Sequence, residues 1–177
     1  MSMKNKLLIF IISLFFFNNL SFAKEFIFKT KNIEIIDNGK FIFAGKGKVI
    51  SSDDDLEINA NKFEYNKELN ILETFGNGKL LINSKKLEID FDNSIIDQKN
   101  LLIKTNGNTK ILDKENNLII TSDSIIYDQK KMTISAISNV VITDIDNGLV
   151  IKTEKITYNQ NNLVPGEEAS VCSIIGD

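Results

Sequence analysis

The chain has 177 residues, which is enough for one domain with a sizeable core and too few for two full domains. Its hydrophobic fraction of 42% and charged fraction of 25% are typical of a globular protein and argue against wholesale disorder. The net charge is −3 and every cation is a lysine, so nucleic acid has no electrostatic reason to bind and bidentate arginine contacts to phosphate are excluded.

The first 23 residues have the three parts of a secretory signal peptide. Lys4 and Lys6 form a short positive region, Leu7–Phe17 is an apolar run, and Ser21–Ala23 places small residues at the two positions that a signal peptidase reads. The run is shorter than the roughly 20 apolar residues that a membrane-spanning helix needs. We expect residues 1–23 to be cleaved after export, and a retained anchor is the alternative.

The following segment, residues 24–164, repeats itself every 31 residues. One series of leucines has this spacing, and an isoleucine follows each leucine two positions later. The two series are Leu56, Leu87, Leu118 and Leu149, and Ile58, Ile89, Ile120 and Ile151. A partial unit precedes them, so the sequence predicts one domain of about four and a half units in register.

Within a unit, apolar and polar residues alternate with a period of two, as in Leu56–Ala60. This period is typical of strands that have one apolar face. Segments rich in Gly, Asn, Ser and Lys, such as Gly76–Gly78 and Asn83–Lys86, are expected to form turns between the strands. The pattern predicts about four short strands per unit, with Gly76–Gly78 at a hairpin corner and little helix.

The alternation assigns one set of side chains to the inward face, where each unit packs against its neighbours. Simple core packing is sufficient to explain any single member of this set. The predicted inward residues are Leu56, Ile58, Phe63, Tyr65, Leu72, Leu80, Leu87, Ile89, Ile103, Ile111, Leu118, Ile120, Ile125, Tyr127, Ile134, Ile142, Leu149, Ile151, Ile156 and Tyr158.

The sequence offers few groups for catalysis or metal binding. There is no histidine, so no Ser-His or Cys-His pair is available, and one cysteine cannot make a zinc site. The acidic cluster Asp53–Asp55 lacks the spacing of a calcium loop, which favours a solvated turn over a calcium site. Cys172 lies in an irregular tail, residues 165–177, where a free thiol is favoured over an intermolecular bridge. We expect no enzymatic activity, metal or cofactor.

Two recurring motifs resemble those of the OstA-like family. The segment Ala60–Asn66 and its later copies Ser122–Asp128 and Thr153–Asn159 look like the ADxxxYD strand of that family. Gly76–Leu80 and Gly107–Ile111 look like its GNVxI step. The resemblance covers nearly the whole chain after the signal peptide, and its repetition makes it more specific than a single motif.

This resemblance implies an all-β fold, an open and twisted antiparallel β-jellyroll often called a β-taco, which holds lipid between two sheets. It implies a periplasmic lipopolysaccharide-transport protein whose inward residues shield lipid A acyl chains and pass them toward the outer membrane. It also implies head-to-tail edge pairing with other β-jellyroll transport proteins or with a second copy. Length favours a stand-alone bridge protein, and the N-terminal domain of the outer-membrane translocon is the alternative.

A different class of protein is compatible with the same repeat. A structural or adhesive β-solenoid at the cell surface would have a filled interior and no lipid ligand. In such a solenoid every inward position is packed side chain against side chain. A lipid slot should instead leave a long apolar cavity open along one side.

Overall fold

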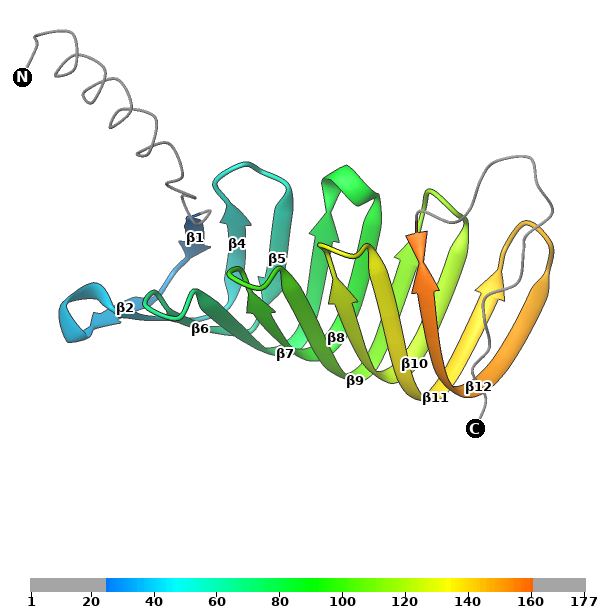
Figure 1. Ribbon diagram of the computed structural model, residues 1–177. Helices are drawn as coiled ribbons and strands as arrows, with labels where there is room; N and C mark the ends of the chain where they lie inside the picture. Colours follow the sequence, from blue (N-terminus) through cyan, green and yellow to red (C-terminus); the bar gives the residue numbers. More distant parts are fainter. Residues whose placement is uncertain (1–24, 161–177) are drawn as a thin grey trace, which may run out of the picture.

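The computed structural model describes residues 25–160, which form one antiparallel sheet of 12 strands with open edges (Figure 1). The predicted open, all-β jellyroll is confirmed. The predicted signal peptide and the tail 165–177 lie outside the described residues. The strands are β1 (Phe26–Thr30), β2 (Ile33–Ile36), β3 (Phe41–Ala44), β4 (Gly47–Ser51), β5 (Leu56–Ala60), β6 (Lys62–Asn66), β7 (Ile71–Ile82), β8 (Leu87–Asp97), β9 (Leu102–Asp113), β10 (Leu118–Asp128), β11 (Thr133–Asp144) and β12 (Leu149–Asn159).

The sheet is folded into two arms that share their long strands. The first arm contains β1, β4, β5 and one half of each strand from β7 to β12, and the second contains β2, β3, β6 and the other halves. Figure 1 shows the arms as the walls of a trough, closed along the bottom where the long strands bend. We call the opposite, open edge between the turns of the two arms the mouth.

The bends coincide with β-bulges in β7, β9 and β11. In β7 the pairing register with β8 shifts between Phe75 and Gly78, and the two residues between them, Gly76 and Asn77, have φ of +79° and +46°. Glycine adopts positive φ without steric penalty and asparagine tolerates it better than most residues. A bulge of this kind bends and twists the strand, which turns it from one arm into the other.

The bulges correct two predictions. A unit contains two long, bent strands rather than four short ones, because each strand continues to pair with its neighbours before and after the bend. Gly76–Gly78 lies inside β7 and is not a hairpin corner. The hairpin turns lie instead at the ends of the arms, as at the short 3-10 turns η1 (Asp37–Gly39) and η2 (Asn83–Lys85). No helix in the described range is long and apolar enough to cross a membrane.

Short polar side chains close many of the turns at the arm ends. Asp97 accepts hydrogen bonds from the backbone N and the Nδ2 of Asn100, at 2.9 and 2.7 Å, and Asp144 does the same with Asn147 at 3.0 and 2.8 Å. These hydrogen bonds lower the pKa of both carboxyls, and the bond from the side-chain amide has the larger effect. The recurring Asp and Asn at strand ends therefore encode the turns.

Gly78 directly follows the bulge, and it gives a test of the packing beside the bend. A Cβ atom there would overlap the ring of Phe91, its buried ladder partner on the neighbouring strand β8, whereas a Cβ at Gly45 would meet nothing closer than the Asn32 Cβ at 3.8 Å. We expect Gly78→Ala to lower the free energy of unfolding by about 1–3 kcal/mol and Gly45→Ala to change it by about 0.5 kcal/mol or less. Urea unfolding of both variants checks this, and equal midpoints would contradict the assigned packing.

Candidate functional site: the interior between the arms

The inner faces of the two arms carry the predicted inward residues and pack against each other. All but three of those residues are buried. Leu118 and Ile151 are half-buried against the core, and Leu149 is 54% exposed. The side chains that the prediction omitted are Ala44, Val49, Ala60, Ile82, Phe91, Ile96, Ala136 and Val140.

Leu149 corrects the predicted inward set, and the twist of the sheet supplies the reason. Across the trough, the first-arm residue Phe26 of β1 contacts Tyr65 of β6, and Asp113 of β9 contacts Tyr158 of β12. The arms are thus offset along the trough, as the twist of a sheet requires. At the C-terminal end, the strands of the first arm therefore extend beyond the second arm. Leu149 faces inward there, as predicted, but has no opposite partner among the described residues.

The offset also uncovers the second arm at the other end. Ile33 and Ile35 of β2 pair through β3 with the inward positions of β6, yet they are 47% and 61% exposed. Within residues 25–160, each end of the sheet thus has an inner face that the opposite arm does not cover, and the two faces belong to opposite arms. Strands β1, β2 and β12 also have one edge without a ladder partner in the described part.

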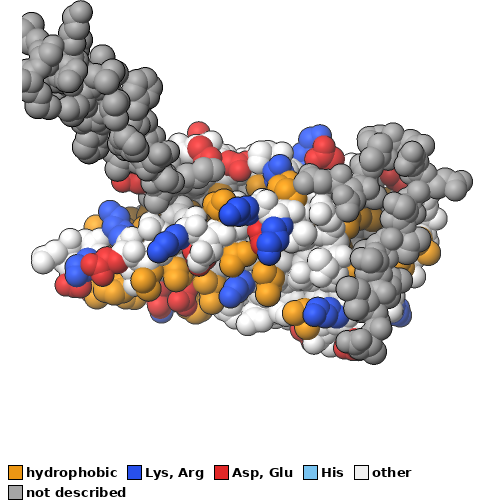
Figure 2. Space-filling model, viewed as in Figure 1, with side chains coloured by type: hydrophobic (Ala, Val, Ile, Leu, Met, Phe, Trp, Pro, Cys, Tyr) orange, Lys and Arg blue, Asp and Glu red, His pale blue; other side chains and the backbone are white. Residues whose placement is uncertain are grey.

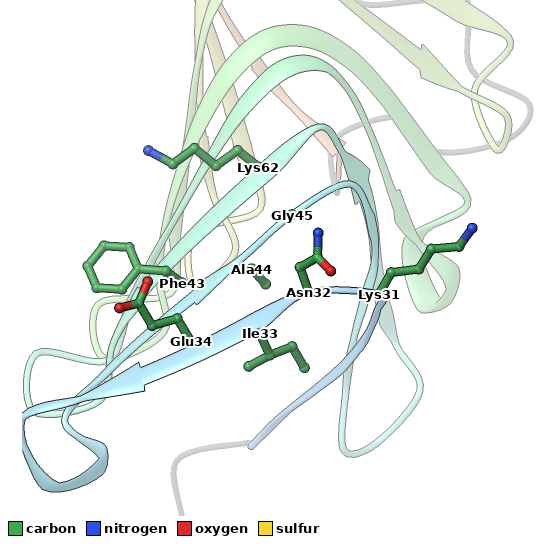
Figure 3. Close-up of a pocket in the computed structure, with 8 residues that line it drawn as sticks. All are labelled: Lys31, Asn32, Ile33, Glu34, Phe43, Ala44, Gly45 and Lys62. Carbon is green, nitrogen blue, oxygen red and sulfur yellow. The ribbon is translucent and has the colours of Figure 1, made fainter.

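Side chains fill the central interior. Leu72, Ile103 and Ile111 are all 0% exposed, so the long open cavity expected of a lipid slot is absent from the described residues. Two surface cavities, of about 510 and 440 Å³, are not lined by these central residues. The larger lies at the N-terminal end, and Figure 3 shows the ammonium groups of Lys31 and Lys62 pointing away from each other, so they do not converge on an anion.

Near the bend the inner faces become small and polar. Thr74 and Ser94 are buried and share a hydrogen bond of 2.7 Å, and the buried Thr105 hydroxyl donates to the Ile125 carbonyl at 3.4 Å. Small hydroxyl side chains fit the narrow angle where the arms join, and local partners satisfy most of their hydrogen-bonding groups. The alternation in the sequence predicts that these side chains face inward, but it does not predict that the space between the arms narrows here.

A polar cluster joins the arms at the C-terminal part of the mouth. The Asp113 side chain is fully buried, and its Oδ2 accepts hydrogen bonds from Tyr158 Oη at 3.3 Å and Gln160 Nε2 at 3.1 Å. Gln160 Oε1 in turn accepts a hydrogen bond from Tyr127 Oη at 3.1 Å. Burial, followed by the nearby carboxylate of Asp113, raises the pKa of Tyr127 to about 12.

Aromatic rings join the arms at the N-terminal part of the mouth. Phe26 meets Tyr65 edge to face at 5.2 Å between centroids, and Phe28 meets Phe63 at 6.4 Å. The two ends of the interior therefore close by different chemistry. Within residues 25–160 there is no group of three or more Cys, Asp or Glu side chains placed to hold a metal ion.

Comparison with known proteins adds a likeness in fold. No protein-family model and no curated protein sequence matches the chain. The fold is similar to that of LptH, described as the LptA-homologous periplasmic component of the lipopolysaccharide transport device of Pseudomonas aeruginosa, with a TM-score of 0.57. The match covers 73% of this chain and 94% of that chain at 9% sequence identity. At such low identity the comparison establishes the shared open β-jellyroll fold.

Truncations on the inner face should distinguish covered from uncovered positions. Ile103→Ala leaves a cavity in the packed interior and should lower the free energy of unfolding by about 2–5 kcal/mol. Leu149→Ala removes an exposed side chain and should change it by about 0.5 kcal/mol or less. Denaturant unfolding measures both, and a large loss for Leu149→Ala would mean that the second arm covers this residue.

The buried Tyr127 should make stability depend on alkaline pH. Its hydroxyl ionises near 10.0 in the unfolded chain and near 12 in the folded protein, so between these values the unfolded state binds fewer protons and stability falls as pH rises. Relative to Tyr127→Phe, the wild-type protein should lose up to about 2–3 kcal/mol of unfolding free energy over this range. Unfolding midpoints measured at each pH, with parallel curves for the two proteins, would refute the raised pKa.

Proposed function

We propose that this protein is a periplasmic lipopolysaccharide-transport protein that shields lipid A acyl chains between its two arms and passes them toward the outer membrane. One observation carries the proposal: the arms share backbone only at the bends, and above the bends their apolar inner faces meet through side chains. They can separate without breaking a backbone ladder. The likeness in fold to LptH supports the same function.

The energetics favour an acyl chain as the occupant. An acyl chain gains about 0.8 kcal/mol for each CH₂ group removed from water, so about a dozen methylenes supply roughly 10 kcal/mol. Parting the arms exchanges contacts between side chains for contacts between side chains and lipid, and both are apolar. The predicted inward set is thus the proposed lipid-binding surface, with Leu149 at its uncovered end.

The head group of the lipid would remain in water outside the mouth. Asp113 is the one fully buried charged side chain in the described range, and it already has hydrogen-bond partners. Lysine and acidic side chains occur together on the outer face seen in Figure 2, with hydrophobic side chains between them. A mixed exterior of this kind suits a chain that binds lipid by its tails.

The ends of the molecule suit partners of the same fold. The uncovered inner face of the second arm at β2 and that of the first arm at β12 lie at opposite ends of the described sheet, and strand edges without a partner among residues 25–160 occur at both. A second copy, or another β-jellyroll transport protein, could add its strands there and continue the apolar interior. Export by the predicted signal peptide, residues 1–23, would place the β-jellyroll of residues 24–164 in the periplasm.

A structural β-protein without a lipid ligand is the second candidate. The filled interior favours it, because central residues such as Ile103 have no exposed surface in this closed form. The two candidates differ in whether lipid can enter between the arms.

Photo-crosslinking to purified lipopolysaccharide separates the candidates. A benzophenone amino acid replaces Phe63, which points inward and is 0% exposed, or Phe43, which pairs with Glu64 on the outward face of the adjacent strand. We expect lipopolysaccharide adducts at position 63 and few at position 43. Equal adducts would indicate adsorption to the surface, and no adduct at either position would refute lipid carriage and leave the structural candidate.

A further inference from the structure

We propose that Asp113, Tyr158 and Gln160 form a clasp that holds the two arms together at the C-terminal part of the mouth, and that this clasp has to open before lipid can occupy the interior beneath it. The first half concerns the protein alone. The second half rests on the proposed function. The two halves are therefore tested by separate measurements.

The clasp crosses the trough. Asp113 ends β9 in the first arm, whereas Tyr158 lies in β12 in the second arm and Gln160 follows it directly. Tyr127, also in the second arm, donates to Gln160 and so links the clasp to the neighbouring unit. Hydrogen bonds to a carboxylate are stronger than those between neutral groups, and they are strongest where water is excluded, as it is around Asp113.

The same carboxylate also accepts hydrogen bonds from its own turn. Asp113 Oδ1 accepts from the backbone N of Glu115 at 3.0 Å and of Asn116 at 3.1 Å, and the Nδ2 of Asn116 reaches Oδ2 at 2.9 Å. Asp113 is thereby fixed in position, with Oδ2 directed at the second arm. Asp113 is thus a preorganised acceptor, and the two other members of the clasp, Tyr158 and Gln160, donate to it from the opposite arm.

Comparison of the repeat units shows that the turn does not need the contact between Asp113 and the opposite arm. The same position in successive units is occupied by Ser51, Ile82, Asp113 and Asp144. Ser51 bonds within its own turn, to Asp53 and the backbone of the β5 start, and Ile82 is apolar. The side-chain bonds of Asp144 are to Asn147 of its own turn. Of these four described positions, Asp113 is the one bonded to the opposite arm.

The two ends of the interior differ in whether lipid can replace the contacts between the arms. At the N-terminal part, rings of Phe26 and Phe28 contact Tyr65 and Phe63, and an acyl chain can replace such contacts with equivalent apolar ones. At the clasp an acyl chain offers no donor, so a carboxylate separated from Tyr158 and Gln160 loses two hydrogen bonds that lipid cannot replace and keeps only those of its own turn. Lipid therefore enters the N-terminal part by exchange of contacts, and the part under the clasp only when the mouth parts.

The distance between the arms tests the first half without lipid. Nitroxide labels on Glu115→Cys and Lys130→Cys, exposed turn residues of the first and second arm, report the width of the mouth once Cys172 is replaced by serine. Loss of both donors in Tyr158→Phe/Gln160→Ala leaves the buried carboxylate without its opposite-arm partners. We expect the fraction of molecules with a longer distance to rise by about tenfold or more.

The matched control removes the same two kinds of side chain elsewhere on the second arm. Tyr65 Oη bonds to Gln98 Oε1 at 3.4 Å along that arm, and Tyr65→Phe removes this hydroxyl but keeps the ring that contacts Phe26 across the mouth. Tyr65→Phe/Gln98→Ala should therefore leave the distance distribution unchanged. Cooperative unfolding and an unchanged circular dichroism spectrum establish that both variants fold. A clasp variant that folds with the wild-type distribution, or a control that widens equally, would overturn the clasp.

Crosslinking to purified lipopolysaccharide tests the second half. A benzophenone amino acid at Ile156, an inward position two residues from Tyr158, should form adducts several-fold more readily in the clasp variant than in the wild type, while adducts at Phe63 stay constant. Widening without added adducts at Ile156 would overturn the requirement for opening. No adducts at Phe63 in either protein would refute lipid carriage and with it the second half, and the distance result would still decide the first.

Discussion

Side-chain packing between two arms is the interaction on which the rest of this structure depends. Every backbone ladder among residues 25–160 runs along one arm or the other, and the arms share backbone only where the long strands bend. Van der Waals contacts of side chains such as Leu72, Ile103 and Ile111 therefore hold the interior together. Each contact is weak, but their summed energy is large. No backbone ladder in this range joins the two inner faces, so side-chain contacts alone hold them together.

The bend makes such an interior possible, and it is encoded in a few residues per unit. Gly76 and Asn77 in β7, and Gly107 and Asn108 in β9, adopt the positive φ that the bulge needs. In β11 the same step uses Ser138 and Asn139, so the geometry persists where the glycine is lost. Because the bulge adds twist as well as bend, it also offsets the arms and leaves an inner face uncovered at each end.

The same geometry explains why the interior closes differently at its two ends. At the N-terminal part the offset brings Phe26 opposite Tyr65, and apolar rings meet. At the C-terminal part it brings Asp113 opposite Tyr158, and a carboxylate meets hydroxyl and amide donors. One repeat therefore builds an interior that is held by apolar ring contacts at one end and by hydrogen bonds to a buried carboxylate at the other.

The sequence by itself determined the all-β character, the 31-residue unit and the inward parity, because a period of two decides which face of a strand each side chain occupies. It placed Ile58, Leu72 and Ile134 correctly in the core for that reason. It could not decide that Gly76–Gly78 bends a strand instead of ending it, since both use positive φ, nor that Leu149 lacks an opposite partner, since the offset arises from accumulated twist. Asp113 was missed because its partners lie 45 and 47 residues away on the other arm, a pairing that only the tertiary structure creates.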